Sequence, residues 1–535
     1  MTEKIINSKV CNEPEVKIEQ ENKNKYFPLT KRDTTFAVLF ALVAVLFSGL
    51  GLFGGFRIGY TVSAVFGWFV LTVYLWNKNT KIKFFPLICG ILSLVLPTVF
   101  LTTSNGSVRF WSLTAVPLLA MAWFASLVDY GDFGGDLELV RNFAHQIFLG
   151  MFGKLPKTFM SLFAAKSERK SKVGKALLGI LLAIPVLMIV IPLLISSDVA
   201  FAGFVKSFFE NITLTVFKVI VGLIITPFLI SYCFALKNSE KHVSTPSKFR
   251  GIDNVIVISF LSALSVCYFT YLFSQLAYFF SAFNGFLPEG YKFNLSSYAR
   301  RGFFEMSAIA AINLIIIFGA LLLSRKKNGK ICIPSRLICL FISIFTLIII
   351  ATAISKMVLY IRELGMTRLR ITTSAFMIFL AIVFLSVILR LFISKIKVLR
   401  VALVTAGMVL LVLGSVNVNH VVAAYNYHAY ENNMLKTIDV ETIYNLGDEG
   451  IPYLAKLLSD DDIDDINVVV SARNYLEQAI EYTYYDIDYD YNTRTYTIYG
   501  KKYDKLENFG IYRMKAYEVL EEFIEENSST YVVEG

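Results

Sequence analysis

The sequence has few charged residues for its length. They make up 17% of the 535 residues, whereas hydrophobic residues make up 56%. A soluble domain of ordinary composition carries about 25% charged and about 45–50% apolar residues. The apolar excess lies in separate blocks, at least ten of which reach the roughly 18–20 residues that cross a bilayer core. This composition excludes an ordinary soluble protein.

The signatures of several common enzyme chemistries are also absent. The sequence contains no Walker loop, no GxSxG, no HExxH and no dinucleotide-binding turn. Its four histidines offer little material for metal-centred hydrolysis, and its six cysteines include no CxxC pair. We therefore expect no metal site and no cofactor, and the pattern favours a non-enzymatic protein.

The hydropathy pattern predicts an all-α fold, a polytopic transmembrane helix bundle of about 11 spans, because backbone polar groups in lipid must be satisfied within each segment. A small, mostly helical soluble domain with one β-hairpin is expected after the bundle. The predicted regions are a disordered cytoplasmic tail (1–33), four transmembrane helices (34–128), a cytoplasmic amphipathic and basic loop (129–174), a seven-helix transmembrane region (175–416) and an acidic, tyrosine-rich domain (417–535).

Positive charge is concentrated in alternate loops between the predicted spans. The basic loops are 77–83, 154–172, 237–250, 325–336 and 394–400. Because loops rich in Lys and Arg stay in the cytoplasm, eleven predicted spans place the N-terminus inside the cell membrane and the C-terminal domain outside it. The basic loops are expected to contact anionic lipids, and no nucleic-acid partner is implied.

The loop 129–174 contains a helical pattern of its own. Apolar residues between Leu137 and Met151 recur at steps of three and four, and Asn142, His145 and Gln146 fall on the other face. This spacing predicts an amphipathic helix. It fits a helix lying in the cytoplasmic interface, and it fits equally well a helix packed against the bundle.

A polar stripe follows one face of the predicted span 253–283. Its members, three or four residues apart, are Tyr268, Tyr271, Gln275 and Tyr278. Because hydrogen-bonding side chains are costly in lipid, the stripe is expected to face the bundle interior, either bonded to neighbouring helices or lining a cavity.

Arginines lie in two loops that the charge alternation places outside, where positive charge is unusual. The candidate residues for binding an anionic group are Arg300, Arg301, Arg362, Arg368 and Arg370, and the candidate pairing carboxylates are Glu305 and Glu363. Arg301 and Glu305 are four residues apart and can pair along a helix. Three partners fit the arginines: the acidic C-terminal domain, lipid phosphates or an anionic ligand.

The C-terminal domain is acidic and rich in tyrosine. Residues 417–535 hold 9 Lys/Arg against 23 Asp/Glu, a net charge of −14, and 17 of the chain's 28 tyrosines. The segment "YTYYDIDYDYNTRTYTIYGKKYD" alternates aromatic and polar residues, which predicts a strand pair. The tyrosines fit a contact surface for a partner, and they fit aromatic pairing across a small sheet.

Four motifs carry a family resemblance: "YLFSQLAYFFSAF", "YARRGFFEM", "YIRELGMTRLRI" and "VNVNHVVAAYN". In this order they resemble a bacterial membrane-protein family catalogued as a domain of unknown function, the 4173 type, and its relative, the 4153 type. The likeness covers roughly residues 180–445. It implies a polytopic integral membrane protein of the bacterial cell envelope and supplies no catalytic residues.

Three functions remain after these observations. The first is a non-enzymatic sensor or scaffold with an extracytoplasmic C-terminal domain that contacts an envelope protein or lipid phosphate. The second is a transporter or lipid-handling protein that uses the polar stripe and the arginines. The third is a membrane-embedded transferase acting on a lipid-linked substrate, with Glu305 or Glu363 as the base.

Overall fold

The computed structural model describes most of the chain, with gaps. The described residues are 30–53, 57–77, 80–130, 135–163, 179, 183, 186–187, 189–203, 214–238, 251–283, 303–325, 331–460, 463, 465–490, 495–502 and 510–533, without the side chains of 159–160, 162–163, 274–283 and 303–304.

The protein is an all-α, multi-pass membrane protein, as predicted. Among the described residues, ten helices are long and apolar enough to cross a membrane. Their elements are α2 (Lys31–Leu46) with η1 (Phe47–Leu52), α3 (Ile58–Leu75), α4 (Phe84–Val95) with η2 (Leu96–Thr98) and α5 (Val99–Thr102), α6 (Gly106–Leu127), α11 (Leu214–Asn238), α12 (Asn254–Phe283), α14 (Phe303–Leu323), α15 (Ile333–Leu364), α16 (Arg368–Phe392) and α17 (Val398–Val416). The remaining predicted span, 175–195, is described only in part, and its described stretch 189–195 is helical.

The chain forms two compact units. The first comprises Met1–Gly90, Ala120–Phe133 and Val140–Val243, and the second comprises Ile91–Leu119, Gly134–Leu139 and Ser244–Gly535. The second unit thus contains both transmembrane helices and the C-terminal region, defined here as residues 417–535.

Helices α2 and α11 of the first unit approach closely because a glycine faces a backbone. A Cβ atom at Gly222 would lie 2.5 Å from Val45 Cα and 2.9 Å from Val45 N. Small residues at such points let membrane helices pack through van der Waals contact, which replaces the missing hydrophobic driving force.

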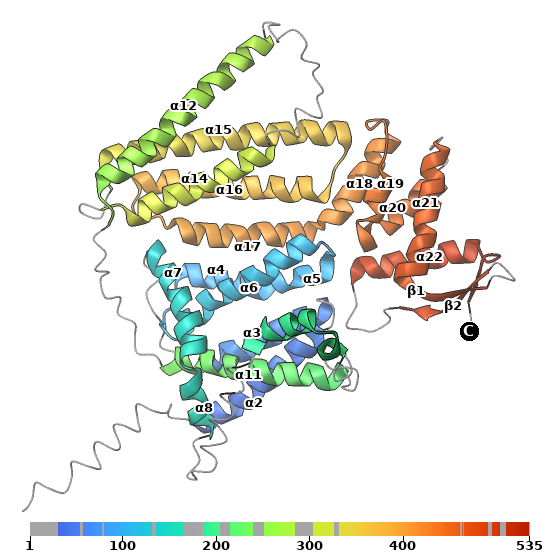
Figure 1. The fold of residues 1–535 in the computed structure, drawn as a ribbon, viewed down its shortest axis with the longest axis horizontal. Coiled ribbons are helices and arrows are strands. Elements are labelled where there is room, and N and C mark those ends of the chain that lie inside the picture. Colours follow the sequence, from blue (N-terminus) through green and yellow to red (C-terminus); the bar gives the residue numbers. More distant parts are fainter. Residues whose placement is uncertain are drawn as a thin grey trace, which may run out of the picture. The chain divides into compact units, whose positions relative to one another are not determined.

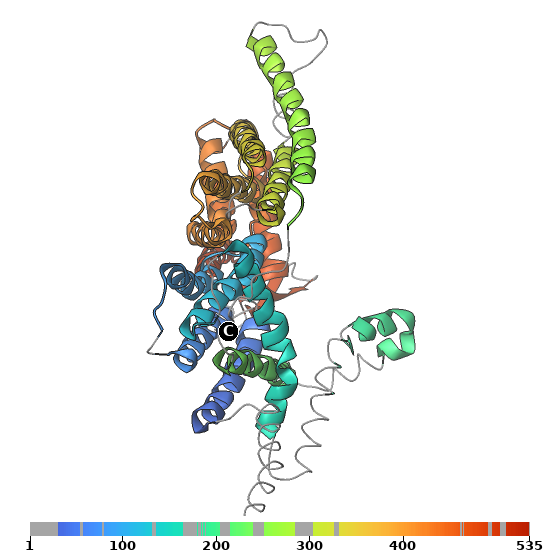
Figure 2. The same cartoon turned by 90° about the vertical axis from the view of Figure 1, so that its left-hand side faces the viewer.

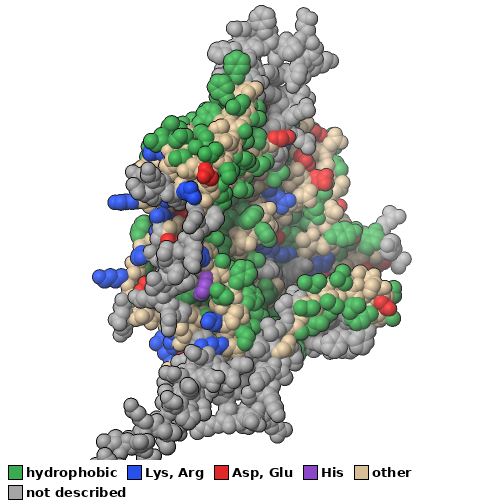
Figure 3. All heavy atoms as spheres, turned by 60° about the vertical axis from the view of Figure 1, so that its left-hand side comes forward, with side chains coloured by type: hydrophobic (Ala, Val, Ile, Leu, Met, Phe, Trp, Pro, Cys, Tyr) green, Lys and Arg blue, Asp and Glu red, His purple; other side chains and the backbone are tan. Residues whose placement is uncertain are grey.

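In the second unit, α14, α15, α16 and α17 lie side by side and are seen nearly end-on after a quarter turn (Figures 1 and 2). Their shared core contains fully buried aliphatic and aromatic side chains, including Ile342, Phe345, Met377 and Phe384. Hydrophobic side chains also cover much of the outer surface (Figure 3), as expected where the solvent is lipid.

Three helical segments precede α11 in the chain: α7 (Asp136–Ala144), η3 (His145–Gly153) and α8 (Leu155–Phe163). In Figure 1, η3 and α8 lie across α11 and not along it. The Tyr232 hydroxyl on α11 donates to Gln146 Oε1 at 3.0 Å. The predicted polar face is therefore turned toward the protein, while Phe148 is 68% exposed.

The C-terminal region is mostly helical, as predicted. Its helices are α18 (Val418–Glu431), α19 (Val440–Tyr444), η4 (Gly447–Glu449), α20 (Ile451–Ser459), α21 (Ile466–Gln478) with η5 (Ala479–Tyr484), and α22 (Ile511–Glu526). Strands β1 (Tyr485–Asp490) and β2 (Thr495–Lys501) form the expected antiparallel pair. A third strand, β3 (Tyr531–Val533), pairs parallel with β2 and was not anticipated.

Replacing Gly222 by alanine should lower the thermal stability of the purified protein in detergent. The added Cβ would overlap the backbone at Val45, and overpacking of this kind costs about 1–3 kcal/mol. Gly319→Ala on α14 is the matched control, because nothing lies within 4 Å of its added Cβ. Equal melting temperatures for the two variants would contradict the close packing of α2 and α11.

Candidate functional site

The structure brings four of the predicted charged residues to one hairpin. Arg362 and Glu363 lie in the last turn of α15, and Arg368 and Arg370 lie in the first turn of α16. Arg370 Nη1 donates to Leu364 O at 3.0 Å and also to Gly365 O. These bonds cap carbonyls at the end of α15, where a cation is favoured by the helix dipole.

The other two arginines of the hairpin, Arg362 and Arg368, are exposed, and so is Glu363. Arg370 itself is held further by its guanidinium carbon, 4.0 Å from the centre of the Tyr360 ring. Arg300 and Arg301 lie outside the described residues, so their predicted pairing with Glu305 lies outside them too. Glu305 is exposed in the first turn of α14.

The hairpin contacts the C-terminal region through an amide group. Asn426 on α18 accepts a hydrogen bond from Met366 N at 2.6 Å and donates to Met366 O at 2.8 Å. Gly365, with φ of +74°, allows this approach, because a Cβ there would lie 2.7 Å from Asn426 Oδ1. In the described residues, the contact between the hairpin and α18 is thus made by the neutral side chain of Asn426.

The polar stripe on α12 is bonded to neighbouring helices at its first member. The Tyr268 hydroxyl donates to Asn313 Oδ1 on α14, and Asn313 Nδ2 donates to Thr346 Oγ1 on α15 at 2.9 Å. Tyr268 also stacks on Phe345, with ring centroids 4.5 Å apart. Asn313 escaped the sequence analysis, although an amide in the middle of an apolar helix marks an interhelical contact.

The other members of the stripe are less constrained or not described. Tyr271 meets the edge of Phe345, with ring centroids 6.2 Å apart, and is 38% exposed. The side chains of Gln275 and Tyr278 lie outside the described residues. The described part of the stripe therefore acts in helix packing.

A buried carboxylate joins the C-terminal region to the ends of two spans. Glu449, in η4, is 1% exposed. Its carboxylate accepts hydrogen bonds from Ser104 N at 3.1 Å, Ser104 Oγ at 2.5 Å, Asn417 Nδ2 at 3.0 Å and Asn419 Nδ2 at 3.2 Å. Ser104 lies between α5 and α6, and Asn417 lies between α17 and α18. We call these four residues the Glu449 junction.

The surroundings of the junction are also hydrogen-bonded. Asn417 Nδ2 donates to Thr102 O at 2.6 Å, and Asn419 Nδ2 donates to Leu446 O at 2.9 Å. Asn105 Nδ2 donates to Asn419 Oδ1 at 3.3 Å. Every described hydrogen-bond donor to the carboxylate is neutral, so hydrogen bonds and not an ion pair hold it in place. Sequence reasoning missed it because its parts are more than 300 residues apart.

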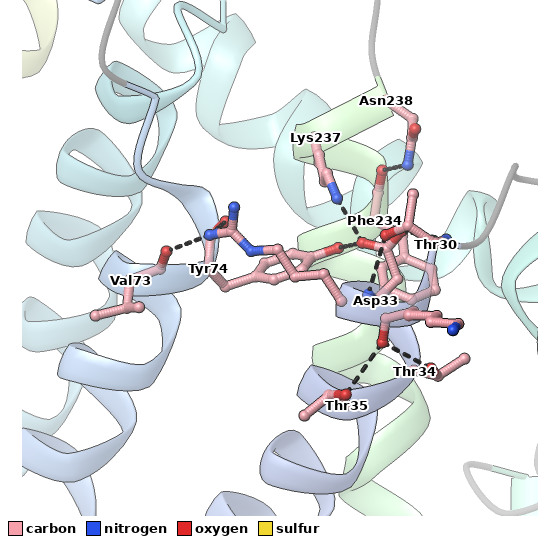
Figure 4. Close-up of polar contacts among 11 residues, drawn as sticks. Thr30, Asp33, Thr34, Thr35, Val73, Tyr74, Phe234, Lys237 and Asn238 are labelled. Atoms are coloured by element: carbon pink, nitrogen blue, oxygen red, sulfur yellow. Dashed lines mark hydrogen bonds and ion pairs between the residues drawn. The ribbon is translucent and has the colours of Figure 1, made fainter.

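A second buried carboxylate lies in the first unit (Figure 4). Asp33, near the start of α2, is 4% exposed. Its Oδ1 lies 2.5 Å from Lys237 Nζ on α11 and accepts from the Tyr74 hydroxyl on α3 at 2.8 Å. Its Oδ2 accepts from Thr30 N at 2.8 Å and Thr30 Oγ1 at 2.7 Å.

This Asp33 cluster connects three transmembrane helices at one end of the unit. Lys237 Nζ also lies 5.0 Å from the centre of the Tyr74 ring, which adds a cation–π contact. Ionisable groups in membrane helices are rare and are retained for function or for pairing. Both carboxylate oxygens of Asp33 already accept hydrogen bonds from protein donors. The geometry therefore favours a role in holding the three helices together over a role as a catalytic carboxylate.

Metal chemistry gains no support from the side-chain arrangement. Among the described residues, no three His, Cys, Asp or Glu side chains lie close enough together to hold a metal ion. His145 instead forms a hydrogen bond with the Tyr130 hydroxyl.

Breaking the Asp33–Lys237 pair should destabilise the protein more than removing both charges. Asp33→Asn and Lys237→Met should each lose about 3 kcal/mol, since each leaves a partly buried charge unpaired, whereas the double variant should lose less than the sum. The measurement is thermal unfolding in one detergent. Lys31→Met, at an exposed position of the same helix end, is the control. Additive losses would show that the two groups do not interact.

Comparison with known proteins gives one match. A family model described as a domain of unknown function, DUF4153, matches residues 64–457. No curated protein and no solved structure matches the chain. The match begins closer to the N-terminus than the likeness over 180–445, and it ends within α20. It therefore covers nine of the ten described spans in whole or in part, and all four residues of the Glu449 junction.

Proposed function

The chain belongs to the DUF4153 family, and we propose that it is a non-enzymatic sensor or scaffold whose helix bundle controls the position of its C-terminal region. The observation that carries this proposal is the Glu449 junction. It links the α5–α6 turn, the end of α17 and the segment that enters α20 through one carboxylate. A shift of either span end would therefore be transmitted to the C-terminal region.

A second contact between the bundle and the C-terminal region is also made by directional hydrogen bonds of a buried polar side chain. Asn426 holds the backbone of Met366 through two hydrogen bonds. Thus the α15–α16 hairpin and the α5–α6 turn both hold α18 or the residues beside it. Two separated contacts fix the orientation of a rigid element, whereas one would leave it free to rotate.

A transporter that uses the polar stripe is less well supported. The Tyr268 hydroxyl of that stripe donates to Asn313 on α14, which in turn donates to Thr346 on α15. A substrate pathway needs groups that remain available to a passenger. The network therefore favours a packed bundle.

The positions of the helix ends support an odd number of membrane crossings. Within the first unit, Thr80, which follows α3, donates to Leu127 O at the end of α6 at 3.1 Å. The end of α3 also meets Asp33, which is paired with Lys237 at the end of α11. Hence α11 finishes at the end where α6 finishes, and one crossing between these helices supports the expected span 175–195.

In the second unit, the two ends of α17 have different neighbours. Asp136, shortly after α6, accepts a hydrogen bond from Leu399 N at the start of α17 at 3.0 Å. The other end of α17 meets the end of α5, where Thr102 Oγ1 donates to Gly414 O at 2.8 Å. With the basic loops inside, we propose a bacterial cell-membrane protein with a cytoplasmic N-terminus and an extracytoplasmic C-terminal region.

Accessibility to a membrane-impermeant maleimide should distinguish the two sides. In a background with the six cysteines replaced, Ser459→Cys in the C-terminal region should react in intact cells. Ser394→Cys, in the basic α16–α17 loop, should react only after permeabilisation, and both positions are exposed. The reverse pattern would overturn the proposed orientation, and reaction of both in intact cells would refute the opposite-sides topology.

Replacing Glu449 by glutamine should loosen the C-terminal region while leaving the bundle folded. Gln offers one acceptor oxygen and brings an amide donor toward Asn417 and Asn419, so at least one buried donor loses its partner, at a cost of about 1–3 kcal/mol. We expect faster amide hydrogen exchange in α18 and α20 and unchanged exchange in α15 and α16.

Glu441→Gln is the control for this substitution, because Glu441 is an exposed carboxylate on α19. Exchange in α18 and α20 that is the same in both variants would refute coupling through the Glu449 junction. Loss of exchange protection throughout the bundle in the Glu449 variant would refute a role confined to positioning the C-terminal region.

A further inference from the structure

Two lysines of the acidic C-terminal region lie on tyrosine rings beside one histidine. Lys456 Nζ on α20 is 5.1 Å from the centre of the Tyr453 ring, and Lys515 Nζ on α22 is 5.3 Å from the centre of the Tyr512 ring. His420 on α18 lies between the rings, with centroid distances of 5.7 Å to Tyr453 and 5.2 Å to Tyr512. We call these five residues the basic–aromatic surface.

The two lysines of this surface act on the neighbouring histidine. Burial lowers the pKa of His420 from its ordinary value, and the nearby charge of Lys515 lowers it further, with a smaller effect from Lys456, while Glu449 opposes these effects. Both lysine side chains are exposed, and among the described residues neither forms an ion pair with a carboxylate. Lys456 and Lys515 therefore form a small basic patch in a region whose net charge is −14.

The surface lies close to a membrane boundary. His420 follows Val416, the last residue of α17, by only four residues, roughly 6 Å along a helix. Helix α22 contacts α5, which ends another span. Two of the helices that carry the surface, α18 and α22, are therefore held beside the ends of transmembrane helices.

Apolar side chains accompany the lysines at this boundary. Ile511 is 46% exposed and Met514 is 48% exposed, both in the first two turns of α22 beside Lys515. On α6, Phe110 is 58% exposed and Trp111 is 59% exposed, one to two turns from the junction residue Ser104. Exposed aromatic residues and lysines with apolar stems are typical of the headgroup level of a bilayer.

We propose that the basic–aromatic surface binds the phosphate groups of lipid headgroups at the end of α17. The ammonium groups of Lys456 and Lys515 provide the charge, and the Tyr512 hydroxyl and the His420 imidazole provide hydrogen bonds to phosphate oxygens, while the buried Tyr453 supports Lys456 and His420 from below. The neighbouring apolar residues enter the boundary between headgroups and acyl chains. The C-terminal region is thereby held against the membrane through a surface distinct from the Glu449 junction.

The test uses the full chain in lipid nanodiscs containing phosphatidylglycerol with a photoactivatable headgroup. After irradiation, mass spectrometry measures the label on peptides from α18, α20 and α22, relative to the label on the basic loop 394–400. Lys456→Ala/Lys515→Ala should reduce this ratio at least five-fold, because each lysine near an anionic surface contributes a factor of roughly five. Lys456→Arg/Lys515→Arg should retain the label.

Lys501→Ala is the control at a paired lysine of the same region, because Lys501 lies 2.5 Å from Glu521. An equal loss in this control, or an unchanged ratio in the double alanine variant, would overturn the proposal. So would displacement of the label by inorganic phosphate, which would identify a site for free phosphate, or by excess phosphatidylcholine as effectively as by phosphatidylglycerol. Unchanged hydrogen exchange of α22 in the double variant confirms that the helix remains folded.

Discussion

A polar group in the membrane must find its partner within the protein, because hydrocarbon offers no hydrogen bonds. This constraint accounts for the described polar clusters. Asp33 connects the ends of α2, α3 and α11 through an ion pair and a hydrogen bond, and Asn313 connects α12, α14 and α15 through two hydrogen bonds. Glu449 gathers the turns at the ends of α5 and α17. In each case, partners distant in sequence are brought together because the alternative is an unsatisfied polar atom, which costs several kcal/mol.

The buried carboxylates Asp33 and Glu449 are satisfied in different ways. Asp33 has a cation, Lys237, within 2.5 Å, so its charge is compensated locally. Glu449 accepts four hydrogen bonds from neutral donors: two from Ser104 in the α5–α6 turn, one from Asn417 and one from Asn419. An ion pair tolerates small changes in direction, whereas a set of directional hydrogen bonds depends on the position of every donor. The second arrangement therefore depends more strongly on the positions of the helices that carry the donors.

The sequence predicts the bundle well because hydrophobic length is a local property. Ten predicted spans appear as helices, and the β1–β2 hairpin follows from alternating residues. The Asp33 cluster was missed because its paired residues are 204 positions apart and each is an ordinary helix-end residue. The short strand β3 was missed because three residues carry almost no periodic signal.

In a membrane protein, hydropathy does not say which side chains of a helix are buried, because the surrounding solvent can be lipid. In η3 the polar Gln146 is buried and Phe148 is exposed, since lipid reverses the usual inside and outside. Likewise, the tyrosine spacing on α12 identified a shared face, but only the fold supplies Asn313 as the partner. Among the predicted arginines, Arg370 has a definite role as a cap for α15, which the charge pattern alone does not distinguish from ligand binding.

The left-handed backbone at Asn417, with φ of 54°, joins α17 directly to α18 without a flexible linker. Asparagine tolerates this conformation better than most residues, and its side chain caps α18 by accepting from His420 N. The two helices thus form a stiff elbow. Since α18 extends about 21 Å, a tilt of about 10° at the elbow would displace its far end by about 4 Å. The geometry of a single residue thereby makes α18 a stiff extension of the last span, so that a slight tilt of α17 becomes a larger displacement at the far end of α18.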